Sequence, residues 1–339
     1  MKLHNRTPDI ENLYAVLRRE VPSRPTLFEL FMNDPLYEML SGRKKPIDSP
    51  LEYLKFRIDA FSAAGYDYTT TGACEMSFNP TENFRKESIS LNDNFIITDE
   101  ASFEAFDWPD VENYDFSTLD DIKDYLPGNM KLMIMGPSGV LENVIELVGY
   151  DNLCYMLYEN PDLVRLIFDA VGSRLLKYYE IAANFDSVGI IMVNDDWGFN
   201  TQTFLSTEQM REYVFPWHKR IVETARVHKL PAVLHSCGNL QMVMDDVIEM
   251  GFSGKHSYED AIIPVEDAYE KWHDQIAILG GIDVDYLIRR DTDEITSRCR
   301  TMIERTAARG GWALGTGNSV PEYIPQDKYL AMIKTALQE

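Results

Sequence analysis

The chain has 339 residues, of which 45% are hydrophobic, and 55 acidic against 32 basic residues give a formal net charge of -23. This hydrophobic share is ordinary for a globular protein with a sizeable core, and the acidic balance argues against nucleic acid and anionic membrane surfaces as partners. No apolar stretch is long enough to span a bilayer.

The cysteine content and the N-terminal segment indicate in which cellular compartment the protein is found. Four cysteines in so long a chain do not form a disulfide framework and suit a reducing environment. The segment from Met1 to Arg18 carries charges throughout and lacks the apolar core of a signal peptide. We therefore expect a cytoplasmic protein.

Helix starts and ends are marked in several places. Residues 1–23 predict a leading helix before the first strand. At 49–52 a serine cap, a proline in the first turn and a carboxylate three residues after the cap predict a helix that ends at Gly65. A later helix is predicted over 207–229, with a kink at Pro216.

Short apolar runs lie between the helices, and their near-continuous apolar character is typical of parallel strands covered on both faces. The eight runs are Pro25–Phe31, Tyr66–Thr71, Lys131–Met135, Val188–Val193, Ala232–Leu234, Phe252–His256, Ile276–Leu279 and Trp312–Leu314. Several are separated by one helix-sized segment, as in βα units. We predict an α/β fold with one domain over 1–339, a (β/α)8 TIM-type barrel whose functional residues follow the strands.

One long segment departs from this rhythm. Residues 73–130 form an insertion between the second and third predicted strands. Within it, 87–91 and 95–98 flank the turn-prone tripeptide 92–94, a pattern that predicts a hairpin. Because an insertion after a barrel strand lies at the catalytic face, we expect this one near the mouth of the pocket.

The fifth predicted strand ends in His235-Ser236-Cys237-Gly238. Residues two apart on an extended segment point to the same side, so His235 and Cys237 should converge. An imidazole and a thiol together suit Zn²⁺, which at a catalytic site needs a third protein ligand and keeps one position open. The alternative is a buried small Cys237 beside a His235 that hydrogen-bonds substrate.

Acidic residues follow two other strands. Asp195 and Asp196 are adjacent, so one can face the barrel mouth while the other caps a loop or helix. Glu259 and Asp260, after the sixth predicted strand, present the same choice. His256 is more simply a hydrogen-bond partner than a ligand. These carboxylates are candidate acids, bases or metal ligands.

The strand ends, taken in order, resemble the uroporphyrinogen decarboxylase superfamily, and within it the cobalamin-dependent methyltransferases. The resemblance covers nearly the whole chain. It is carried by Gly136-Pro137, Asn194-Asp195-Asp196-Trp197-Gly198, His235-Ser236-Cys237-Gly238, Gly280-Gly281-Ile282-Asp283 and Gly315-Thr316-Gly317-Asn318-Ser319-Val320-Pro321.

The decarboxylase itself is a poor match. It carries an arginine-rich segment after its first strand that binds substrate carboxylates, whereas residues 28–33 here contain Glu29 and no arginine. We therefore expect no uroporphyrinogen decarboxylation.

The methyltransferase branch is closer. Its thiol-methylating members bind zinc through a His-x-Cys pair and a later cysteine, and His235 and Cys237 resemble the first two ligands. Gly317-Asn318 stands where the later cysteine would be. The resemblance leaves two alternatives: Glu259, Asp195 or Cys74 replaces that ligand, or the metal is absent. Loss of the soft ligand favours the members that demethylate methoxylated aromatics.

This resemblance implies a methyltransferase that moves a methyl group from a small methylated donor to the cobalt of a corrinoid carried by a partner protein. His235, Asp196 and Glu259 are the candidate catalytic residues, and His235, Cys237 and Glu259 are the candidate zinc ligands. Glu29, Trp197, Tyr258 and Asn318 are the candidate substrate-binding residues. The alternatives are a methylcobalamin:thiol methyltransferase and a non-catalytic barrel that binds a corrinoid or tetrapyrrole.

Overall fold

The computed structural model describes residues 2–78 and 96–337. Its centre is a seven-stranded parallel sheet in which the strands follow one another in chain order. The strands are β1 (Tyr68–Gly72), β2 (Lys131–Met135), β3 (Val188–Asn194), β4 (Ala232–His235), β5 (Gly254–His256), β6 (Ala277–Leu279) and β7 (Trp312–Ala313). Each corresponds to one of the runs predicted from the sequence.

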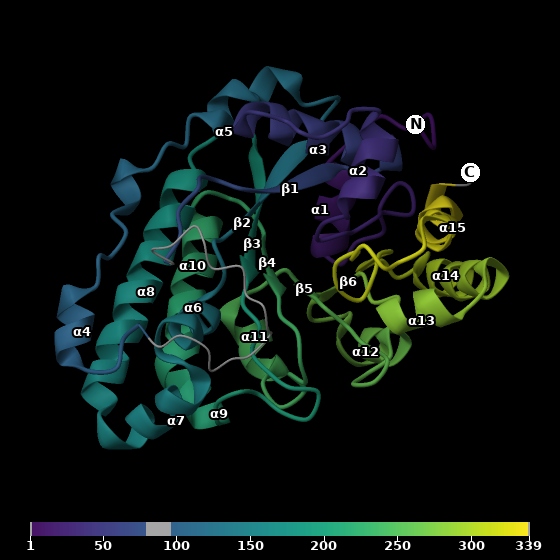
Figure 1. The fold of residues 1–339 in the computed structure, drawn as a ribbon. Helices are drawn as coiled ribbons and strands as arrows, with labels where there is room; N and C mark the ends of the chain where they lie inside the picture. The colour runs from purple at the N-terminus through teal and green to yellow at the C-terminus, as the bar shows by residue number, and fades with distance from the viewer. Residues whose placement is uncertain (1, 79–95, 338–339) are drawn as a thin grey trace.

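Helices surround the strands on several sides (Figure 1). They are α1 (Glu11–Leu17), α2 (Asp34–Ser41), α3 (Pro50–Ala64), α4 (Glu100–Ala105), η1 (Val111–Asn113), α5 (Thr118–Asp121), η2 (Lys123–Tyr125), α6 (Val140–Val148), α7 (Tyr150–Glu159), α8 (Pro161–Ala182), α9 (Thr207–Gln209), η3 (Met210–Val214), α10 (Phe215–Val227), α11 (Met244–Met250), α12 (Val265–Trp272), α13 (Val284–Arg289), α14 (Thr292–Thr306) and α15 (Gln326–Leu337). Within the described ranges, no helix combines the length and the apolar character needed to cross a membrane.

Local sequence explains the main helix boundaries. Ser49 accepts a hydrogen bond from the backbone of Glu52 at the start of α3, and Gly65 ends that helix with a φ of 103°. The helix predicted over 207–229 is divided by the π-helical turn η3, which immediately precedes α10 and Pro216. A proline lacks the backbone N–H that would continue the regular hydrogen-bond pattern at this point.

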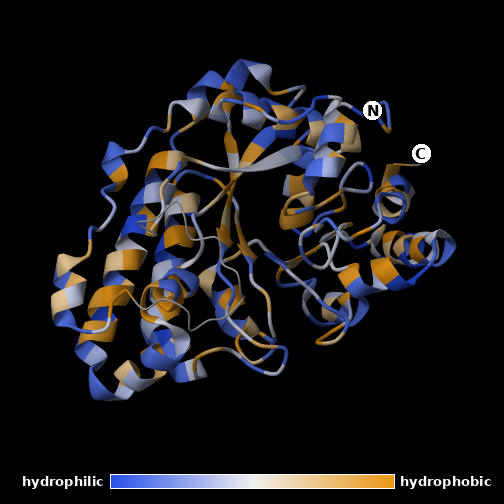
Figure 2. Cartoon of the chain, viewed as in Figure 1, coloured by the Kyte–Doolittle hydropathy of each residue, from blue (hydrophilic) through white to orange (hydrophobic). Residues whose placement is uncertain are grey.

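The sheet is apolar on both faces, as parallel strands beneath helices should be. All of β3 except Asn194 is buried, and Figure 2 shows hydrophobic residues concentrated on the strands. The pairing register aligns Asn194 with His235, and His235 with His256. The carboxyl ends of β3, β4 and β5 therefore lie at one level.

The predicted first strand, 25–31, is wrong as a strand. It forms one isolated bridge, from Leu27 to Leu314. On its other side, its backbone groups bond to side chains of β1. The Tyr68 hydroxyl accepts the N–H of Glu29 and donates to its carbonyl, and the Thr70 hydroxyl donates to the carbonyl of Leu30. On this side, side-chain hydroxyls and not the backbone groups of β1 bind the segment. The segment therefore lies between β7 and β1 without forming an eighth strand.

The insertion at 73–130 is described only in part, and most of the predicted hairpin falls outside the described residues. Ile96 and Ile97 both donate backbone hydrogen bonds to the carbonyl of Leu147 at the end of α6. Farther along, Arg174 and Lys177 of α8 bind the segment that contains η1. The described part of the insertion therefore packs along α6 and α8.

Candidate functional site

Three side chains from the ends of β3 and β4 form one cluster. His235 is the last residue of β4, Cys237 follows it by two residues, and Asp196 lies two residues beyond β3. Their ligand atoms all lie within 4.8 Å of one another. Because His235 and Asp196 come from strands that pair directly, the register of the sheet brings them together.

A glycine holds the two loops close enough for this cluster to form. Gly238 adopts a φ of +92°, and a Cβ at that position would lie 2.3 Å from the carbonyl oxygen of Gly198. Any larger residue would be strained in this backbone conformation and would push the β3 loop away. The glycine after Cys237 therefore positions Asp196.

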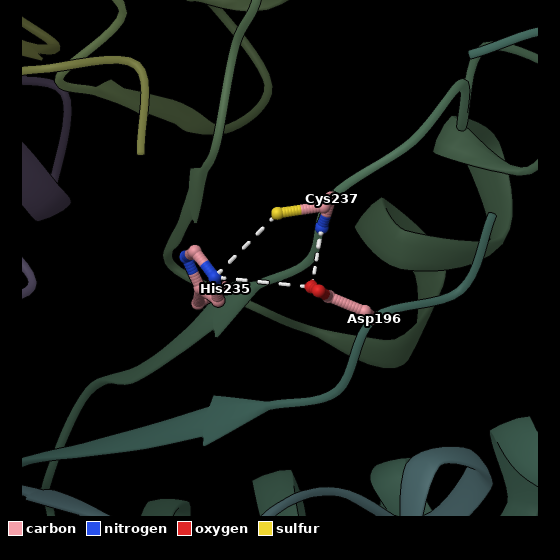
Figure 3. Close-up of side chains that lie close together, drawn as sticks. All are labelled: Asp196, His235 and Cys237. Atoms are coloured by element: carbon pink, nitrogen blue, oxygen red, sulfur yellow. Dashed lines mark hydrogen bonds and ion pairs between the residues drawn. The ribbon is translucent and has the colours of Figure 1, made fainter. Parts of the chain in front are cut away.

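The cluster has short internal contacts (Figure 3). Nε2 of His235 lies 3.8 Å from Sγ of Cys237 and 3.8 Å from Oδ1 of Asp196. The backbone N–H of Cys237 donates to Oδ1 of Asp196 at 2.8 Å. Nitrogen, sulfur and oxygen donors facing one point form a set that can hold a divalent ion.

A chain of hydrogen bonds sets the tautomer of His235. The carbonyl of Thr316 can only accept, so Nε2 of His256, at 3.0 Å, carries the proton. In a neutral His256 the other nitrogen, Nδ1, is then an acceptor, and Nδ1 of His235 donates to it at 2.8 Å. The Nε2 lone pair of His235 is thereby left facing Cys237 and Asp196.

Burial keeps both imidazoles neutral. It lowers the pKa of His235 to about 3 and lowers the pKa of His256 well below the usual range. A neutral histidine whose second nitrogen donates to a fixed acceptor is the usual form of a metal-ligating histidine. His235 is therefore organised as a ligand through Nε2.

Asn318 contacts the cluster at the place where the resemblance would put a second thiolate. Its Oδ1 accepts the backbone N–H of Ser319 at 2.8 Å, and its Nδ2 donates to Sγ of Cys237 at 3.2 Å. An amide nitrogen is no metal ligand, so Asp196 is the third ligand that the geometry offers. Burial, with a smaller contribution from Asp196, raises the pKa of the Cys237 thiol well above its usual value, whereas the N–H of Asn318 favours the thiolate.

Asp195 faces away from this cluster and holds the start of α6. It accepts the backbone N–H groups of Leu141 and Glu142, each at 3.0 Å. Its Oδ2 also lies 2.9 Å from Nε2 of His218, and both side chains are fully buried. The two neighbouring aspartates thus divide their roles, as their opposite directions on an extended segment predict.

Glu259 lies outside the cluster. It is half-buried and lines a small cavity of about 20 Å³ together with Lys255 and Tyr258. Burial, followed by the charge of Asp283, raises the pKa of Glu259. Cys74, another ligand considered from the sequence, is also absent from the cluster.

The candidate substrate-binding residues are placed in different surroundings. Trp197 has no exposed surface and stacks on His218 at 5.0 Å. Glu29 is also fully buried, with Oε1 accepting the hydroxyl of Thr316 at 2.7 Å. Tyr258 is 3% exposed, and its ring lies under the Lys255 ammonium at 4.4 Å. Of the four candidates, Asn318 touches the cluster.

Sequence reasoning missed three groups near the site. Lys255 on β5 is buried, and this burial lowers its pKa to about 8. His218 comes from α10, where no spacing links it to Asp195. Glu142 accepts hydrogen bonds from the Ser138 hydroxyl and the N–H of Gly139, and a glutamate at the third position of a helix often accepts the N–H of the residue before it in this way, a signal that could have found it. Burial, followed by Asp195, raises the pKa of Glu142.

Comparison with known proteins identifies the family. The sequence pattern of the family described as Uroporphyrinogen decarboxylase (URO-D) matches residues 66–338. The chain belongs to this family. The resemblance drawn from the strand ends is thereby confirmed at the level of the superfamily.

One solved structure in particular shares the fold of this URO-D family chain. A methyltransferase from Methanosarcina mazei is similar over 96% of this chain and 97% of its own, with a TM-score of 0.73 and 15% identity. TsXylA, an intracellular xylanase from Thermoanaerobacterium saccharolyticum, aligns over 93% of this chain and 90% of its own, with a TM-score of 0.43 and 13% identity. No curated protein matches the sequence.

Proposed function

We propose that the chain is a methyltransferase. It moves a methyl group from a small methylated donor, most favourably a methoxylated aromatic, to the cobalt of a corrinoid carried by a partner protein. The observation that carries this proposal is the Asp196, His235 and Cys237 cluster at the end of a URO-D family barrel, with the His235 lone pair turned into it. The likeness to a methyltransferase from Methanosarcina mazei supports it.

The cluster is better suited to binding zinc than to acting as a proton donor. Its imidazole nitrogen, thiol and carboxylate are the donor types that zinc takes, and three protein ligands leave one position for substrate. In the tautomer set by Thr316, Nε2 of His235 has no proton to give. A zinc ion bound here would act as a Lewis acid on the ether oxygen, which must leave when the methyl group is transferred.

The protein's own residues would hold and orient this arrangement. His256 fixes the ring of His235 through Nδ1, and Asn318 supports a thiolate on Cys237 with an N–H donor. Asp196 is held by the backbone of Cys237. Correct alignment of donor and acceptor is the main task, because the reduced corrinoid is itself a strong nucleophile.

Membership of the family does not make this chain a decarboxylase of uroporphyrinogen. That substrate carries eight carboxylates, and the segment after residue 27 offers Glu29, which is buried against Thr316. We propose that the tetrapyrrole is not decarboxylated here.

The activity can be tested with free cob(I)alamin as the methyl acceptor. The purified chain is mixed with it and with a panel of methoxyarenes, methylamines and methylated thiols, and the cobalt spectrum is followed. Methylation of cobalt by a methoxyarene supports the proposal. Demethylation of methylcobalamin by a thiol would instead support a thiol methyltransferase, and binding without turnover would support a corrinoid-binding barrel.

The metal is tested separately, by elemental analysis of the purified protein. We expect about one zinc per chain, lost in Cys237→Ala. Cys154→Ala is the matched control, because Cys154 is a half-buried cysteine of α7 outside the cluster. A wild-type protein that contains no zinc and cannot be loaded with it, or a Cys237→Ala variant that keeps both zinc and activity, would overturn the zinc assignment.

A further inference from the structure

A second feature of the catalytic end is a cavity of about 500 Å³ beside Arg57. It is lined by Gly72 at the end of β1, by Gly136 directly after β2, and by residues 31–34. Small-molecule sites in proteins have volumes of this order, and barrel enzymes place them at the carboxyl ends of the strands.

Arg57 reaches this cavity from α3, and the part of the chain that the structure describes gives it no anionic partner. Its Nη2 donates to the hydroxyl of Thr70 at 2.9 Å, and its guanidinium lies over the ring of Tyr37 at 5.6 Å. Among the described residues, no carboxylate lies within ion-pair distance of it, and its buried Nε has no hydrogen-bond partner. A half-buried guanidinium held only by neutral groups keeps an unbalanced charge.

The nearby Arg43 shows the contrast. It pairs with Glu52 at 3.2 Å and with Asp59 at 3.0 Å, and it donates to the hydroxyl of Tyr125. Arginines in this part of the fold are thus paired where the chain supplies acids. Arg57 differs from Arg43 in that its side chain lines the cavity, where the described residues supply no acid to pair with it.

The acids that line the cavity do not neutralise Arg57. Asp34 forms an ion pair with Lys45 at 2.6 Å, and Glu322 is exposed. Arg57 is the sole basic residue among the described residues that line the cavity. The wall also includes Phe31, whose side chain is 39% exposed, and Met135. A ligand with an anionic end and an apolar body would match these surroundings.

Two segments connect this cavity to the cluster. Val320 lines the cavity two residues after Asn318, which contacts Cys237. Gly136 also lines it, and its N–H donates to the side chain of Asn194, the residue at the end of β3 before the two aspartates. A ligand in the cavity therefore lies against the same loops that shape the cluster.

We infer that this cavity binds a small organic carboxylate through Arg57, with the apolar body of the ligand against Phe31 and Met135. A guanidinium presents paired N–H donors that match a carboxylate. This inference rests on the proposed function in one respect: it gives the methylated donor a carboxylate group, as in a methoxybenzoate. The binding itself does not require methyl transfer.

The test compares 4-methoxybenzoate with 4-methoxybenzamide, its neutral analogue, by calorimetry on the purified chain. We expect the carboxylate to bind at least about tenfold more tightly than the amide, because a hydrogen bond between two charged groups is stronger than one to a neutral group. Arg57→Gln should remove this preference, and Arg57→Lys should restore part of it. Arg165→Gln is the matched control, because Arg165 also lies over a tyrosine ring, that of Tyr213 at 5.3 Å, but on the surface of α8.

The inference is overturned if neither 2-, 3- nor 4-methoxybenzoate binds, if the amide binds as tightly as the acid, or if Arg57→Gln keeps the preference. Circular dichroism and thermal unfolding verify that Arg57→Gln is folded. Binding of a methoxybenzoate without methylation of cob(I)alamin would leave this inference standing and remove the proposed methyl transfer. Methylation from neutral methoxyarenes, with no methoxybenzoate bound by the protein, would remove this inference and leave the proposed methyl transfer standing.

Discussion

The Nδ1 atoms of His235 and His256 lie 2.8 Å apart, and this contact links the cluster to the interior of the barrel. His256 is in turn held by the carbonyl of Thr316. The direction of the lone pair on His235 is thus decided by a backbone carbonyl from the other side of the site. Partners of this kind tune metal ligands without touching the metal.

Replacing His256 should therefore weaken metal binding although His256 is not a ligand. In His256→Phe the N–H of His235 loses its acceptor, and we expect zinc affinity to fall by about 10- to 100-fold. His256→Gln should recover part of the loss, because its side-chain oxygen can accept that N–H. Competition with a chromophoric chelator measures the affinity. Equal affinities in all three proteins would show that the histidine pair has only a packing role.

Asn318→Cys tests whether a second thiolate can be added to the cluster of Asp196, His235 and Cys237. The amide nitrogen of Asn318 lies 3.2 Å from Sγ of Cys237, so a thiol placed there would lie within reach of the same ion. We expect this variant to retain zinc at least about tenfold more strongly against a chelator, since thiolates are preferred zinc ligands. Asn318→Ser is the control for loss of the amide. No gain in retention would place the ion away from residue 318.

Gly238→Ala tests whether the loop contact positions the cluster. A Cβ there would meet the carbonyl of Gly198, whereas at Gly42, which also has a positive φ, nothing lies within 4 Å of it. We expect Gly42→Ala to cost about 1–2 kcal/mol of unfolding free energy, from backbone strain alone. Gly238→Ala should cost clearly more and reduce zinc content. Equal losses in urea unfolding would exclude the steric contribution.

The sequence predicts the seven strands well because each is a short buried apolar run, and its pattern needs no tertiary information. The run at 25–31 has the same composition, yet its backbone groups meet the Tyr68 hydroxyl instead of a neighbouring strand. No local pattern shows which chemical group will satisfy a backbone N–H. Composition alone therefore could not show that the run at 25–31 does not form a strand.

Site residues at strand ends could be predicted from the sequence, whereas site residues on helices could not. The spacing of His235 and Cys237 on one strand places both side chains on one side. Arg57 and His218 belong to α3 and α10, and no motif relates either residue to the strand ends. Their proximity to the catalytic end follows from packing of whole helices, which one sequence does not specify.

Glu29 predicts a pH dependence of stability. Its side chain is fully buried, and burial raises its pKa from 4.5 to about 8, against the opposing effect of hydrogen bonds from Thr316. The folded state therefore keeps the proton at pH values where the unfolded state has released it. For an acid whose folded pKa is raised, stability is fully present below about pH 4.5, falls as the pH rises, and is constant again above about pH 8.

Glu29→Gln should remove this contribution, because the amide carries no titrating proton and its oxygen can still accept the hydroxyl of Thr316. Unfolding free energies of the wild type and the variant are measured between pH 5 and 9 and subtracted, so that titrations shared by both proteins cancel. Each tenfold change in proton affinity corresponds to about 1.4 kcal/mol, so the difference should grow by a few kcal/mol in favour of the variant as the pH rises. Glu75→Gln, at an exposed position, makes the same change of charge and should show no such trend. A constant difference across this range would mean that Glu29 is ionised in the folded protein and that the hydrogen bonds from Thr316 outweigh its burial.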